Sequence, residues 1–106
     1  MPKGYVILTE DIRDRAGMDA YGAASTAPLV EFGGRVLVVD EQVEVLEGTW
    51  HGTRTVVVEF ESVERVREWY DSPSYQAALP LRQGAAECNV VILAGFELPH
   101  LEAPDE

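Results

Sequence analysis

Hydrophobic positions recur along the chain with two different spacings, and their order predicts six secondary-structure elements. Runs rich in β-branched and aromatic residues indicate strands, whereas apolar positions three to four residues apart indicate helices. The predicted order is strand, helix, strand, strand, helix, strand, over residues 5–9, 11–32, 35–46, 53–61, 62–80 and 88–96.

Proline, glycine and serine refine the ends of these elements. Pro28 is expected to stop or bend the first helix, and Gly33 with Gly34 to end it. Ser62 and Ser72 stand where helix-capping residues are expected, so the second helical region is predicted in two pieces. Residues 35–46 suit either one long bulged strand or a small hairpin, followed by a loop over 47–52.

This order predicts an α+β, ferredoxin-like βαββαβ fold: a four-stranded antiparallel sheet with its helices on one face. The strands are apolar on both faces, since Val58 and Phe60 alternate with Val57. Two helices can cover only one face, so a second copy of the chain is expected on the other, giving a homodimer through the sheet face. The alternative is that loops and the tail cover it. Placing the bulky Phe60 on the helix side puts Glu59 on the dimer side, although both faces are apolar enough for the reverse.

Composition narrows the classes of partner. The chain has 106 residues and a net charge of −11, which disfavours nucleic acids and anionic membranes as partners. It has one cysteine, Cys88, and no apolar run long enough to span a membrane, so a cytoplasmic location is predicted. Residues 1–97 are expected to form a single domain, with an acidic, proline-containing tail over 98–106.

No motif for a metal or cofactor is present in the sequence. His51 and His100 are far apart, with no paired-histidine or Cys/His spacing. Gly33–Gly34 is a turn signal and not a phosphate loop. We therefore expect neither a metal site nor a cofactor.

Four segments occur in one order along the chain: Phe32-Gly33-Gly34-Arg35, Leu46-Glu47-Gly48, Val57-Val58-Glu59-Phe60 and Trp69-Tyr70-Asp71-Ser72-Pro73-Ser74-Tyr75-Gln76. In this combination the chain resembles the family called domain of unknown function 1330, from about Gly4 to Gly95. The resemblance implies a dimeric α+β barrel. The wider superfamily includes cofactor-independent monooxygenases, isomerases, and dehalogenating and haem-handling enzymes, together with members of no known chemistry.

Glu59 is the first candidate for chemistry, because a carboxylate between Val58 and Phe60 lies on the face predicted to line the barrel cavity. A buried carboxylate needs a partner or a raised pKa, and could then serve as an acid or base. Arg35, Arg54 and Arg82 are its available partners. The alternative is a structural ion pair.

The remaining candidates surround such a cavity. Tyr75 is expected to orient a ligand with its hydroxyl, and His51 beside Trp50 to shuttle a proton from a loop, unless both loop side chains are simply solvated. Arg35 is expected to clamp an anionic group or to pair with Glu47 or Glu59. The predicted ligand-binding set is Arg35, Tyr21, Glu47, Trp50, Arg54, Trp69 and Arg82.

Three functions remain open at this stage. The first is a homodimer that binds a small organic molecule in its barrel cavity, as a cofactor-independent enzyme for proton transfer, isomerisation, cyclisation or oxygenation. The second is a non-catalytic ligand-binding or stress-related dimer. The third is a protein-interaction module that works through its acidic surface.

Overall fold

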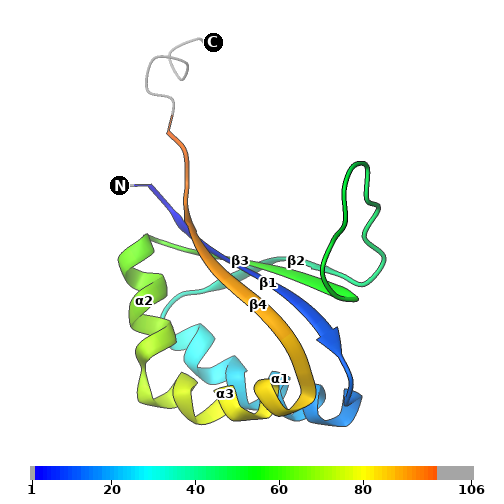
Figure 1. Ribbon diagram of the computed structural model, residues 1–106. Helices are drawn as coiled ribbons and strands as arrows, with labels where there is room; N and C mark the ends of the chain where they lie inside the picture. Colours follow the sequence, from blue (N-terminus) through cyan, green and yellow to red (C-terminus); the bar gives the residue numbers. More distant parts are fainter. Residues whose placement is uncertain (1, 98–106) are drawn as a thin grey trace.

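The protein is a two-layer α+β structure in which one sheet carries all the helices on a single face (Figure 1). The computed structural model describes residues 2–97. The four strands pair antiparallel in the order β2-β3-β1-β4, which confirms the predicted ferredoxin-like fold. The elements are β1 (Gly4–Ile12), α1 (Arg15–Glu31), β2 (Arg35–Asp40), β3 (Arg54–Phe60), α2 (Val63–Asp71), α3 (Pro73–Ala85) and β4 (Ala86–Ala94).

The core lies between the sheet and the helices. Alternate residues of the central strands, such as Val6 in β1 and Phe60 in β3, point toward the helices and are almost fully buried. Trp69 of α2 packs between Phe60 and Tyr75 of α3, with ring centroids 5.3 and 4.2 Å away. These aromatic contacts fix the angle at which α2 and α3 lie on the sheet.

Side-chain caps and glycines define the helix ends. Ser62 accepts a hydrogen bond from the amide of Arg65, and Ser72 one from that of Tyr75, which confirms the two predicted caps. Gly33 has a φ of +75° and ends α1 as predicted. Its amide donates to Val30, and the next amide donates to the carbonyl of Leu29, the bonding pattern that glycine permits at a helix end.

Several boundaries differ from the prediction: β1 runs on to Ile12, α1 begins only at Arg15, and β4 spans Ala86–Ala94. Pro28 does not stop α1, which continues to Glu31, because a proline removes only one intrahelical hydrogen bond and this one is buried in the last turn. Pro80 likewise lies inside α3. The region 35–46 is neither a long strand nor a hairpin: β2 ends at Asp40, with a bulge between Val36 and Val38, and residues 41–53 form a loop.

The face of the sheet opposite the helices is apolar and open. Val91 and Leu93 of β4 are 48% and 46% exposed. Phe60 faces the helices and Glu59 the open side, as expected from their sizes. Both faces of the sheet are therefore apolar, as the strand patterns predicted.

No helix within residues 2–97 is long and apolar enough to cross a membrane. The predicted acidic tail over 98–106, with His100, lies outside the described residues.

Candidate functional site

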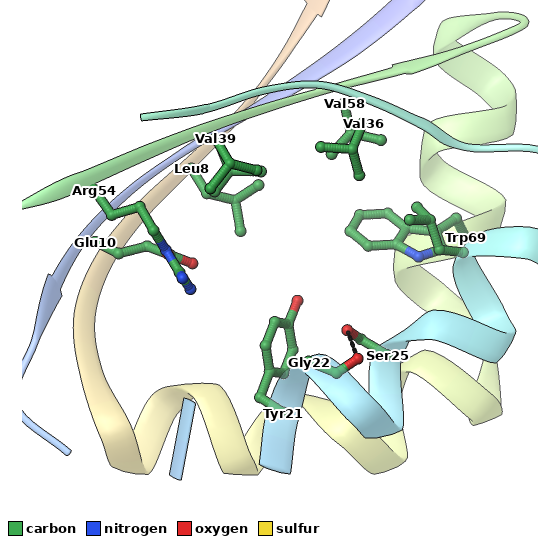
Figure 2. Close-up of a pocket in the computed structure, with 12 residues that line it drawn as sticks. Leu8, Glu10, Tyr21, Gly22, Ser25, Val36, Val39, Arg54, Val58 and Trp69 are labelled. Carbon is green, nitrogen blue, oxygen red and sulfur yellow. Dashed lines mark hydrogen bonds and ion pairs between the residues drawn. The ribbon is translucent and has the colours of Figure 1, made fainter. Parts of the chain in front are cut away.

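A pocket of about 180 Å³ lies between the sheet and α1 (Figure 2). Side chains from β1, β2 and β3 form one wall, residues of α1 form the facing wall, and Trp69 of α2 closes one end. Most of the lining is apolar. The residues that line it are Leu8, Glu10, Tyr21, Gly22, Ser25, Leu29, Val36, Val39, Arg54, Val56, Val58 and Trp69.

A buried ion pair stands at the other end of the pocket. Glu10 and Arg54 are directly opposite each other on β1 and β3, so both side chains point to the helix side. The Nε of Arg54 donates to Oε1 of Glu10 at 2.7 Å, and the Glu10 side chain is only 2% exposed. In Figure 2 both side chains descend from the sheet toward Tyr21 on α1. The pair therefore places a carboxylate and a guanidinium at the edge of an apolar space.

The loop before β3 sets the position of this pair. Gly52 has a φ of +83°, and a Cβ there would lie 2.6 Å from the carbonyl carbon and oxygen of Glu10. Only glycine lets the loop approach this closely, so that the next amide, that of Thr53, donates to the Glu10 carbonyl at 2.7 Å. Arg54 then enters β3 in register with Glu10. Cys88 of β4 is the partner of Glu10 on its other side, so Arg54, Glu10 and Cys88 form one row across three strands.

Two tyrosines meet below the row. The hydroxyls of Tyr21 and Tyr75 are 2.7 Å apart, and their rings cross at 81°. Burial raises the pKa of Tyr21 well above its ordinary value, so this hydroxyl stays protonated and can donate or accept a hydrogen bond. The guanidinium of Arg82 lies 5.8 Å from the centre of the Tyr21 ring. Arg82 is 3% exposed and forms no salt bridge with any residue in 2–97.

Trp69 supplies an unused hydrogen-bond donor. Its side chain lines the pocket and its Nε1 is buried, yet among residues 2–97 no atom accepts a hydrogen bond from it. Leaving a buried donor unpaired costs about 1–3 kcal/mol.

The structure brings half of the predicted site residues together. Tyr21, Arg54 and Trp69 line the pocket, and Tyr75 and Arg82 stand directly behind Tyr21. All five lie on the helix side of the sheet, away from the interior face on which the sequence suggested a cavity.

The other predicted residues lie on the open face or in the loop. Glu59 accepts hydrogen bonds from Tyr5 at 2.9 Å and from Arg35 at 3.2 Å, an ion pair of the kind weighed as the alternative. The Nδ1 of His51 lies 2.9 Å from the Thr9 hydroxyl on the same open face.

Trp50 is held on that face too, where its Nε1 donates to Thr55 at 2.8 Å. Glu47 is exposed in the loop. A catalytic or binding role for Glu59, His51, Arg35, Trp50 and Glu47 stays a prediction, because none of them lines the pocket.

Glu10 is the site residue that sequence reasoning missed. The signal was present: Val6, Leu8 and Glu10 follow one another with the two-residue period of one strand face. Because the predicted strand ended at Thr9, Glu10 was not assigned to the buried strand face that it continues. Within residues 2–97, no three His, Cys, Asp or Glu side chains gather closely enough to hold a metal ion.

Comparison with protein families identifies the chain. The model of the family described as Domain of unknown function (DUF1330) matches residues 3–96. The chain belongs to this family. No curated protein matches it. DUF1330 membership agrees with the four sequence segments described above and extends over both layers of the fold.

Several solved structures share the fold at low identity. A protein of unknown function from Rhodopseudomonas palustris is 22% identical, with a TM-score of 0.74 over 92% of this chain and 85% of that chain. A dimeric ferredoxin-like protein of unknown function from Bacteroides fragilis is 15% identical, with a TM-score of 0.57 over 87% and 95%. SnoaB, a cofactor-independent oxygenase from Streptomyces nogalater, is 7% identical, with a TM-score of 0.67 over 92% and 97%. At these identities the likeness concerns the fold.

Proposed function

We propose that this DUF1330 protein binds a small, largely apolar organic molecule between its sheet and α1. The observation that carries the proposal is a pocket with mostly apolar walls and a buried carboxylate–guanidinium pair, Glu10 with Arg54, at one end. Apolar walls with a few converging polar groups are the usual composition of a small-molecule site.

The size of the cavity limits the ligand. Its volume is about 180 Å³, and an engineered apolar cavity of about 150 Å³ in another protein accommodates benzene. The pocket therefore suits a molecule with a single ring or a short branched chain. Its apolar part would lie against Trp69 at one end, and its polar atoms would contact Tyr21 and Arg54 at the other.

Proton transfer without a cofactor is the second candidate function, and Glu10 is the observation that favours it. Arg54 stabilises the Glu10 carboxylate, which lines the pocket and can accept a proton from a bound molecule. Tyr21, backed by Tyr75, can hydrogen-bond the oxygen on which negative charge then develops. A solved protein of the same fold is a cofactor-independent oxygenase, so cofactor-free chemistry is compatible with this architecture.

We also propose that two copies associate through the open sheet face. Ile7 of β1 and Val57 of β3 lie beside Val91 and Leu93 on this face. Covering them would remove apolar surface from water, and three solved proteins of the same fold are described as dimeric. In such a dimer Glu59 and His51 would lie at the interface, so any acid–base role of these two residues would take place there.

The cytoplasmic location remains a prediction.

A pocket-filling substitution tests the binding proposal. Gly22 lines the pocket and has open space where a side chain would start, so Gly22→Leu should fill it without strain. Gly84→Leu in α3 is the matched control, because it gains the same helix propensity away from the pocket. Single-ring compounds would be screened by ¹H–¹⁵N NMR.

We expect compounds that perturb the amides around Trp69 in the wild type and in Gly84→Leu but not in Gly22→Leu. If no compound binds, or if Gly22→Leu binds as well as the control, the pocket is not the site.

A second experiment tests proton transfer. Each compound that binds would be incubated in D₂O with the wild type and with Glu10→Gln, and the rate at which deuterium enters the compound would be measured. Equal exchange by both proteins would exclude Glu10 as the base.

A further inference from the structure

Arg54 has hydrogen-bonding capacity that the protein itself does not use. Its Nε donates to Glu10, and this is the only hydrogen bond that the described residues make to its side chain. The terminal nitrogen Nη1 lies 3.7 Å from Oε2 of Glu41, too far for a hydrogen bond. The side chain is 20% exposed and its guanidinium points toward Tyr21 across the pocket (Figure 2). The terminal N–H groups are therefore available at the polar end of the pocket.

Glu41 is held mainly by a different residue. It comes just after β2, and both of its carboxylate oxygens accept hydrogen bonds from Arg15 of α1, each at 3.2 Å. Arg15 also holds the pKa of Glu41 below its usual range, so Glu41 remains charged at neutral pH. Glu41 can therefore leave Arg54 without losing its principal partner.

The charges around this end favour an anion. Glu10 pairs with Arg54, and Arg15 pairs with Glu41 and lies near Asp19. Arg54 keeps free terminal N–H groups, and the buried Arg82 forms no salt bridge within residues 2–97, so both guanidiniums present positive charge on the helix side of a chain whose net charge is −11. A planar carboxylate matches the paired N–H groups of a guanidinium in geometry as well as charge.

We propose that the ligand of this pocket is a small monocarboxylic acid whose carboxylate binds the terminal N–H groups of Arg54, in place of Glu41. The inference rests on the proposed function and names its ligand class. The apolar part of the acid fills the space between β2 and α1. Glu41 stays on Arg15 and acts as a resident competitor for Arg54.

Isosteric pairs of probes separate this inference from simple pocket binding. Benzoate and benzamide have the same shape and differ in charge, as do 3-methylbutanoate and 3-methylbutanamide. Dissociation constants would be measured by ¹H–¹⁵N NMR at pH 7, together with the Nε–H signal of Arg54. We expect the acid of at least one pair to bind about tenfold more tightly than its amide, as a charge-assisted hydrogen bond implies.

Three variants test the roles of the individual side chains. Glu41→Gln removes the competitor and should tighten acid binding about threefold, the scale of an exposed ion pair, without changing amide binding. Glu44→Gln is the matched control, since it removes the same charge from an exposed position of the same loop. Arg54→Lys keeps a cation beside Glu10 but loses the planar N–H pair, so it should bring the acid-to-amide ratio close to one.

The outcomes distinguish the two proposals. Equal binding of acid and amide, blocked by Gly22→Leu, would overturn the carboxylate inference and leave the pocket as the binding site. Equal tightening by Glu41→Gln and Glu44→Gln would show a bulk charge effect and overturn the exchange at Arg54. If neither pair binds the wild type, both the inference and the proposed binding of ligands of this size fail.

Discussion

The close approach of Gly52 to Glu10 makes a quantitative prediction about stability. In Gly52→Ala the new Cβ would lie 2.6 Å from the Glu10 carbonyl group and 2.9 Å from its nitrogen, where ordinary contacts begin near 3.4 Å. All three are backbone atoms of a central strand, so the loop has to move instead of the neighbour. That movement breaks the hydrogen bond from the Thr53 amide to Glu10.

The magnitude follows from three contributions. A Cβ at a φ of +83° costs about 1 kcal/mol, the lost backbone hydrogen bond about 1 kcal/mol, and the displaced packing at least about 1 kcal/mol. We expect Gly52→Ala to lower the free energy of unfolding by about 3 kcal/mol. Gly48→Ala in the same loop is the control, because Gly48 has a φ of +80° but nothing within 4 Å of its Cβ, and only the first contribution applies.

Urea unfolding followed by the circular dichroism of the helices would measure both variants, because both glycines lie in the loop outside the helices. All samples would be kept at one protein concentration, since association would add to the apparent stability. Equal losses in Gly52→Ala and Gly48→Ala would refute the reasoning, because the backbone conformation alone would then account for the whole effect.

Three further predictions concern other parts of the molecule. Tyr75→Phe removes the partner of the Tyr21 hydroxyl and should lower the free energy of unfolding in urea by about 1 kcal/mol. An unchanged free energy of unfolding would contradict this and show that the Tyr21 hydroxyl has another partner. Leu93→Glu places a charge on the open sheet face and should convert a dimer to a monomer in sedimentation velocity, whereas an unchanged dimer would locate the interface elsewhere. Burial raises the pKa of the Cys88 thiol, so its alkylation by iodoacetamide should reach half its maximal rate at a higher pH than a free cysteine does. A midpoint at or below that of free cysteine would contradict this.

The fold could be predicted from the sequence because its signals are local and repeated. The alternation through Val56, Val58 and Phe60 marks a strand whatever its neighbours are. Ser62 and Ser72 mark helix starts through hydrogen bonds made within three residues. Pro28 did not stop α1, because the packing of a whole helix outweighs the cost of one proline and packing is not visible in a local pattern.

The site was only partly predictable, because it depends on which face of the sheet is hollow. The sequence indicated correctly that Phe60 faces the helices and Glu59 does not. It could not indicate that space would remain on the helix side, since a cavity is the result of how far α1 lies from the strands. Arg54 was identified as a candidate, but its partner Glu10 is 44 residues away and becomes evident only from the strand register.

The row formed by Arg54, Glu10 and Cys88 has a consequence for the evolution of the family. Each of its members belongs to a different strand, and their backbones are fixed by ladder hydrogen bonds that do not involve the side chains. One residue of the row can therefore be replaced without moving the other two. Cys88 can change alone, whereas Glu10 and Arg54 have to change together, because loss of one would leave the other charge buried and unpaired. The Glu10–Arg54 pair, more than overall identity, is then expected to divide DUF1330 proteins by ligand.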